Sequence, residues 1–129
     1  MRNPTYALAM NKCPSCKTGT LAVITSIDLG PDDDNDGFRF ETFSCGHCDL
    51  AGAGEYEEAR RGTETSVQHR GYAMARTDFT ALDTELRTCP ARSNHRCTCA
   101  VHMRYAATTG THAPTARLPL VSRERIQLG

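Results

Sequence analysis

Residues 11–19 read NKCPSCKTG, and residues 44–52 read SCGHCDLAG. Each stretch contains a C-x-x-C pair, and 28 residues separate the two pairs. A C-x-x-C turn brings two thiolates within reach of one Zn²⁺ ion, and two such turns complete a tetrahedral site. Four protein ligands leave no open position, so we predict a closed, structural Zn²⁺ site. Its ligands are Cys13, Cys16, Cys45 and Cys48.

Two strands are expected between these cysteine pairs. Residues 20–29 alternate well enough for one strand, and residues 38–44 predict a second. Residues 30–37 between them are rich in Gly, Pro and Asp, which is typical of a turn, so the two strands form a hairpin. The expected apolar face of the first strand comprises Leu21, Val23, Ile27 and Leu29, with Thr25 interrupting it.

This arrangement of two cysteine turns around a hairpin resembles a zinc ribbon over about residues 11–58. Glycines soon after the cysteines, Gly19 and Gly46, fit the turn geometry. The resemblance implies a hairpin whose open end holds one structural Zn²⁺ ion. Two alternatives use the same cysteines differently. Disulfides need an oxidising compartment, for which the sequence shows no export signal, and a redox C-x-x-C pair needs a βαβ context, which is missing.

Residues 32–37 read DDDNDG and match the first half of an EF-hand loop. The twelfth position of that loop requires a bidentate Glu and is Phe43 here, so we expect no calcium site. The acidic tip is also similar to the zinc ribbons of transcript-cleavage factors, although their Arg-Ser-Ala lead-in is missing. That resemblance implies a polymerase-associated role. The alternative is a solvated loop whose charges keep the hairpin edge from pairing with other chains.

Two helices are expected in the second half of the chain. Apolar residues at helical spacing predict one from residue 77 or 78 to about residue 88, where Pro90 follows as a stop. A second, short helix is expected over about residues 99–107. Residues 55–61 fit either a strand or a short helix, and residues 62–77 are expected to be irregular. The apolar stripe of the longer helix comprises Phe79, Leu82 and Leu86.

The spacing C-x₇-C-x-C-x₂-H in residues 89–102 predicts a second Zn²⁺ site. Three thiolates and one imidazole are a standard structural set, and residues three apart on a helix share a face. His95 is an alternative fourth ligand. The other alternative is that Cys89 is a buried apolar residue and the remaining thiols are free. The predicted ligands are Cys89, Cys97, Cys99 and His102.

The charge of the chain is zero overall but unevenly distributed. Residues 1–57 carry a net charge of −5, and residues 58–129 carry +5. Arginine makes bidentate contacts with phosphate, so the basic half predicts contact with nucleic acid or a nucleoprotein. Alternatively, the arginines contact the acidic half of the same chain. The candidate nucleic-acid-binding residues are Arg92, Arg96 and Arg104.

Two further functions remain open from the sequence. The acidic segment 32–36 is expected to dock a basic protein partner if the chain is an adaptor. A labile second zinc site would instead suit a thiol redox or zinc sensor. No Gly-rich phosphate loop, G-x-S-x-G, H-E-x-x-H or deaminase motif is present, so we expect no enzymatic activity.

The 129 residues fit one modest domain or two very small ones, and only 39% of them are hydrophobic. Small modules with little core commonly depend on metals, so we expect a small metal-stabilised α+β protein. Its expected parts are an N-terminal arm (1–10), a zinc ribbon (11–58), a helical module with the second zinc (59–108) and a C-terminal tail (109–129). The longest apolar run is about five residues against the roughly 20 that a membrane helix requires. We therefore expect a cytoplasmic protein without a membrane partner.

Overall fold

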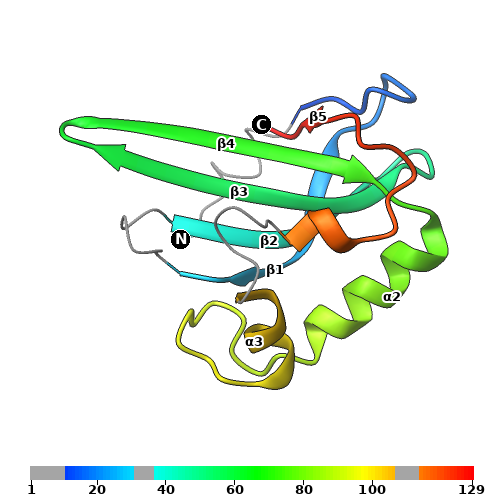
Figure 1. The fold of residues 1–129 in the computed structure, drawn as a ribbon. Coiled ribbons are helices and arrows are strands. Elements are labelled where there is room, and N and C mark those ends of the chain that lie inside the picture. The colour runs from blue at the N-terminus through cyan, green and yellow to red at the C-terminus, as the bar shows by residue number, and fades with distance from the viewer. Residues whose placement is uncertain (1–10, 31–36, 107–113) are drawn as a thin grey trace.

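The computed structural model describes residues 11–30, 37–106 and 114–129, with the backbone alone at residues 60 and 61. These residues form a small α+β structure with an antiparallel five-stranded sheet and two α-helices (Figure 1). Its elements are β1 (Leu21–Asp28), β2 (Gly37–Cys45), β3 (Ala51–Arg61), β4 (Glu64–Ala73), α2 (Arg76–Arg87), α3 (Ala100–Ala106), η1 (Pro114–Arg117) and β5 (Ile126–Gln127). The predicted hairpin is therefore part of a larger sheet.

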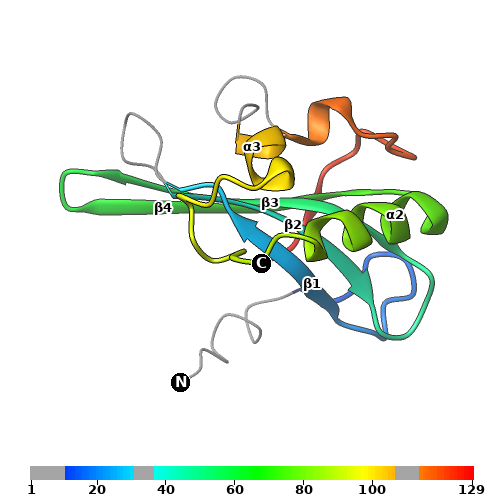
Figure 2. The same ribbon diagram turned by 90° about the horizontal axis from the view of Figure 1, so that it is seen from below.

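The strands follow one another in the order β1-β2-β3-β4-β5, each antiparallel to the next. The pairing of β2 with β3 ends where Gly37 lies opposite Glu58. Beyond this point, among the described residues, β3 pairs with β4 alone, in a hairpin. Figures 1 and 2 both show this hairpin projecting beyond the rest of the sheet. β3 runs without interruption across residue 58, the expected boundary between the zinc ribbon and the helical module.

The expectation that residues 62–77 are irregular is wrong, because β4 occupies Glu64–Ala73 and α2 follows it. The first five residues of β4 are all exposed, and the first three of them lie in the part of the hairpin that projects beyond β2. Because these residues have no buried face, apolar and polar residues do not alternate along them, and this alternation is the pattern that predicts a strand. Gly62, with φ of 63°, provides the left-handed residue of the turn that joins the two strands.

The prediction that Leu21, Val23, Ile27 and Leu29 share one face of the strand is also wrong, because β1 contains a bulge. Val23 lies opposite Phe43, but Thr25 lies opposite Thr42, so Ile24 is the extra residue. An extra residue moves all later side chains of a strand to the opposite faces. Leu21 therefore packs on one side of the sheet, and Ile27 packs on the other.

Each face of the sheet has its own apolar core. The larger core lies between the sheet and the two helices, where Phe40 packs against Tyr105 with ring centroids 4.7 Å apart. The smaller core, on the other face, surrounds Phe43 and Leu128 and includes two cysteines of the first predicted site. The bulge explains this arrangement, because it lets one strand contribute apolar residues to both cores.

The two predicted helices are confirmed to within about two residues at their ends. α2 begins after Ala75, which provides no side-chain cap, and it buries the predicted stripe of Phe79, Leu82 and Leu86. α3 is a seven-residue helix that buries His102 and Tyr105. Among the described residues, neither helix is long and apolar enough to span a membrane.

Candidate metal centres

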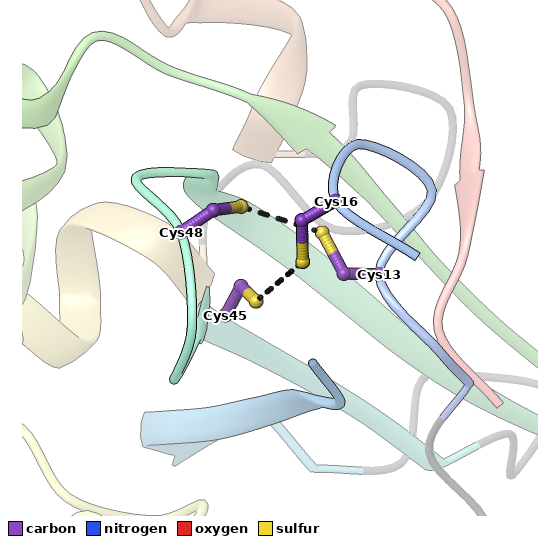
Figure 3. Close-up of side chains that lie close together, drawn as sticks. All are labelled: Cys13, Cys16, Cys45 and Cys48. Atoms are coloured by element: carbon purple, nitrogen blue, oxygen red, sulfur yellow. Dashed lines mark hydrogen bonds between the residues drawn. The ribbon is translucent and has the colours of Figure 1, made fainter. Parts of the chain in front are cut away.

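The first candidate metal centre lies where two cysteine turns meet beside the smaller core (Figure 3). One turn follows Lys12, which bridges to Thr20, and it is closed by a hydrogen bond of 2.8 Å from the Cys13 amide to the Gly19 carbonyl. The other turn joins β2 to β3, and the Cys45 amide donates to the Leu50 carbonyl at 2.9 Å. Each turn therefore projects its two sulfur atoms toward the other turn.

The sulfur atoms of the first centre are spaced as ligands of one metal ion. Cys13 Sγ lies 3.6 Å from Cys48 Sγ, and Cys16 Sγ lies 3.7 Å from Cys45 Sγ. A tetrahedron with Zn–S bonds of about 2.3 Å has S–S edges of about 3.8 Å. A disulfide requires about 2.05 Å, and all four cysteines are free thiols. The geometry thus favours a metal centre over disulfides.

Backbone amides point at these sulfur atoms. The Gly19 amide donates to Cys16 Sγ and the His47 amide to Cys45 Sγ, both at 3.3 Å. Such hydrogen bonds stabilise negative charge on a metal-bound thiolate. A Cβ atom at Gly19 would lie 2.5 Å from Cys45 Sγ, so the turn has no space for a larger residue at this position.

The four thiols of the first centre differ in acidity. Hydrogen bonds from the Thr18 hydroxyl and the Gly19 amide lower the pKa of Cys16 to about 5. The Leu50 amide acts to lower the pKa of Cys48, but burial and the neighbouring thiols outweigh it and raise that pKa to about 11. Four thiolates cannot share this small volume without a cation, and a divalent ion removes their repulsion.

The second candidate centre joins the end of α2, the loop after it and α3. Cys89 follows the last turn of α2 on its buried side, and His102 is fully buried in the first turn of α3. The ligand atoms of this group lie within 4.8 Å of one another, as do those of the first centre. The second group comprises Cys89, Cys97, Cys99 and His102.

His102 is oriented by a backbone group from the distant strand β1. Its Nε2 donates to the carbonyl oxygen of Asp28 at 2.5 Å, and its Nδ1 lies 3.3 Å from Cys89 Sγ. Since a carbonyl only accepts, this hydrogen bond places the proton on Nε2 and leaves Nδ1 as the atom that could bind a metal ion. Cys89 Sγ also lies 3.7 Å from Cys97 Sγ, again close to a tetrahedral edge.

Thiol acidity in the second centre is divided as in the first. Burial raises the pKa of Cys89 to about 11, and the neighbouring Cys99 and Cys97 thiols contribute to this increase. A hydrogen bond of 3.3 Å from the His102 amide lowers the pKa of Cys99. A divalent ion would again favour the thiolate form of all three cysteines.

His95, the alternative ligand in the sequence, lies outside the second group of ligand atoms. It packs instead against Gly30, where a Cβ atom would come within 2.6 Å of the His95 side chain. Gly30 has φ of 82°, which also favours glycine. The structure thus brings together the set that contains His102.

The three predicted nucleic-acid-binding arginines lie around the second centre. Arg92 and Arg96 are exposed in the loop between Cys89 and Cys97. The Arg92 carbonyl accepts a hydrogen bond of 2.8 Å from the Asp28 amide, so this loop is attached to β1. Arg104 is 65% exposed, and its guanidinium forms an ion pair with Glu85 on α2. The acidic segment 32–36 lies outside the described residues.

Sequence reasoning missed two buried polar contacts and the role of Asp28. His69 pairs with the fully buried Glu41. Glu55 is almost fully buried between Arg70 and Thr115, whose hydroxyl donates to it at 2.5 Å. These partners come from adjacent strands or distant segments, and Asp28 acts through its backbone, so no local pattern indicates them.

No family model, curated protein or solved structure matches the chain. The candidate centres therefore rest on their own geometry.

Proposed function

We propose that the chain is a non-catalytic binding protein whose fold is held together by two zinc ions. The convergence of eight ligand atoms into two groups of four supports this proposal most strongly. Thiolate and imidazole ligands suit Zn²⁺, and four protein ligands at each centre give closed sites of a structural type. Zinc would stabilise a fold with thin apolar cores, because a binding site formed only in the folded chain adds its binding energy to folding.

Native mass spectrometry of the purified chain tests the zinc proposal. We expect two zinc ions per chain in the parent protein and one after Cys97→Ser or His102→Ala. His95→Ala is the matched control for His102→Ala, because His95 lies nearby but outside the ligand group, and we expect it to retain two ions. A parent mass with a single zinc that Cys97→Ser leaves unchanged would remove the second centre from the proposal.

The second centre also suggests which partner the protein binds. Its ligands Cys89 and Cys97 enclose a short loop that exposes Arg92 and Arg96 to solvent. Arg104 remains available at the edge of this surface, although it first has to exchange Glu85 for a phosphate. A loop with exposed guanidinium groups suits the backbone phosphates of nucleic acid. We assign these three arginines to nucleic-acid contact.

Fluorescence anisotropy with mixed-sequence DNA and RNA oligonucleotides at 50 mM salt tests this assignment. We expect binding that weakens steeply with added salt and a loss of affinity of at least tenfold when Arg92, Arg96 and Arg104 are all replaced by Ala. Replacement of Arg117, Arg123 and Arg125 by Ala removes the same charge elsewhere and is the control. Absence of binding at 50 mM salt, or equal losses in both triple variants, would contradict the assignment.

A further inference from the structure

The outer edge of β1 is only partly covered by the second centre. β1 is the first strand of the sheet, and among the described strands it pairs with β2 alone. At Asp28 both outward backbone groups are occupied, since the amide donates to the Arg92 carbonyl and the carbonyl accepts from His102 Nε2. The second centre thus takes the place of a neighbouring strand at this one position.

The next outward-facing position along β1 is Ser26. Outward and inward residues alternate along a strand edge, and Thr25 is turned inward because its amide donates to Thr42 Oγ1 at 3.1 Å. The N–H and C=O groups of Ser26 therefore point away from β2, as those of Asp28 do. No described strand lies beside β1 on this side, so one donor and one acceptor remain there for a partner.

A groove runs along this part of the edge. It has a volume of about 520 Å³, which is within the range of sites for small ligands and short peptides. One wall consists of residues 24–26 and 28 of β1, and the opposite wall consists of residues 90–93 of the second-centre loop. Arg39 and Arg92 line it, and Ile24, 40% exposed, contributes an apolar surface at one end.

We propose that this groove binds an extended peptide segment of a protein partner, which adds a short strand to β1 and carries a carboxylate. The segment pairs with the N–H and C=O of Ser26, and its carboxylate meets the exposed Arg92 guanidinium. A peptide suits this edge better than a nucleic-acid backbone, because it offers both a donor and an acceptor at strand spacing. The Asp28 carboxylate also lines the groove, where its Oδ1 accepts the Gly30 amide at 2.7 Å, and among the described residues it forms no ion pair with Arg92.

A direct test uses a fluorescein-labelled seven-residue peptide of alternating Thr and Val with one Glu near its end. We expect saturable binding to the zinc-loaded full chain. Ser26→Pro removes the outward N–H without removing a bond to β2, and it should weaken binding at least tenfold. Arg92→Glu should weaken binding of this peptide by a similar factor. A second peptide, with Lys in place of Glu, should bind the Arg92→Glu variant better than it binds the parent chain. Arg125→Glu makes the same charge change outside the groove and should leave binding unchanged.

The peptide itself provides a test that does not depend on whether a variant folds. N-methylation of alternate amides removes its strand-pairing donors, and binding to the parent chain should then be lost. The proposal would be overturned if the methylated and unmethylated peptides bound with equal affinity. It would also be overturned if the Ser26→Pro variant bound the peptide as tightly as the parent chain does. Displacement of the peptide by a ten-residue oligothymidine whose own binding is weakened by Ser26→Pro would instead assign the groove to nucleic acid. Sedimentation that shows a dimer of the parent chain and a monomer of Ser26→Pro would assign it to a second copy.

Discussion

At the scale of single residues, Gly19 shows how closely the first cysteine turn is packed against the second. A Cβ atom there would lie 2.5 Å from Cys45 Sγ and 2.6 Å from His47 Cβ, both in the opposite turn. Such distances require the two turns to separate, which displaces ligands from a tetrahedral arrangement. Gly46 lies in the other turn and has no atom within 4 Å of the corresponding position.

We expect Gly19→Ala to lower the zinc affinity of the first centre at least tenfold and to destabilise the fold by about 2 kcal/mol, because the added methyl group overpacks the site. Competition with a chromophoric zinc chelator and denaturant unfolding measure the two effects. Gly46→Ala is the control and should change neither quantity. Similar zinc affinities for the two variants would show that the turns are not packed as described.

Asp83 on α2 gives a prediction about pH. Burial acts to raise the pKa of Asp83, but hydrogen bonds from Arg87 at 2.7 Å and Thr42 at 2.8 Å outweigh it and lower that pKa below its usual range. A carboxyl group whose folded-state pKa is lowered stabilises the fold above its unfolded-state pKa of about 3.9. This contribution is lost as the pH falls through the folded-state pKa.

We therefore expect Asp83→Asn to lower the free energy of unfolding by about 1 kcal/mol at pH 7. The difference from the parent chain should shrink toward zero as the pH falls below about 3.9. Urea unfolding of both chains across this pH range measures the difference, and Glu124→Gln, at an exposed position, is the control. A difference that is independent of pH would exclude the Asp83 carboxylate as its source.

At the scale of elements, β5 is a two-residue strand whose position depends on the residue that follows it. β5 pairs with β4 only through Ile126 and Gln127. Leu128 is fully buried in the smaller core, and its amide donates to the His69 carbonyl at 2.9 Å. Packing of this side chain therefore contributes to holding the C-terminal segment against the sheet.

We expect Leu128→Ala to destabilise the chain by about 3 kcal/mol, the usual cost of a cavity in a packed core. Denaturant unfolding measures the effect. Val121→Ala, at a side chain that is 68% exposed, is the matched control and should cost less than about 0.5 kcal/mol. A small effect of Leu128→Ala would mean that β5 contributes little to the smaller core.

The elements also show which features are predictable from sequence. Cysteine spacing and the α2 stripe are local patterns, so both ligand groups and both helices follow from them. β4 is not predictable, because its exposed half has no apolar alternation. The bulge at Ile24 depends on pairing with β2 and leaves no local signal. The hydrogen bond that orients His102 is accepted by a backbone carbonyl 74 residues away, which no side-chain pattern indicates.

At the scale of the whole molecule, β1 connects the two candidate centres. Leu21 at its start packs in the core that contains the first cysteine turns. Asp28 at its end accepts the hydrogen bond of His102 in the second centre. Metal binding at either centre should therefore order the strand that supports the other, which constitutes a thermodynamic coupling between the two sites.

We expect Cys16→Ser to weaken metal binding at the second centre by about fivefold or more, and Cys97→Ser to weaken the first centre by a similar factor, because such coupling is reciprocal. Titration with Co²⁺ separates the two centres, since a four-cysteine site and a three-cysteine, one-histidine site absorb differently. Ser93→Ala, next to the second centre but without a ligand, is the control. Affinities at each centre that do not respond to loss of the other would rule out the coupling.

The contact between the first cysteine turn and Leu128 has a consequence for how the chain folds during synthesis. The Asn11 amide donates to the Leu128 carbonyl at 3.0 Å, and its side chain donates to the Gln127 carbonyl at 2.9 Å across 116 residues of sequence. All four cysteines of the first centre leave the ribosome about 80 residues before Leu128, which corresponds to several seconds of translation. The nascent chain would thus have all four ligands of the first candidate centre early, while the apolar core beside them is completed only when Leu128 has been made.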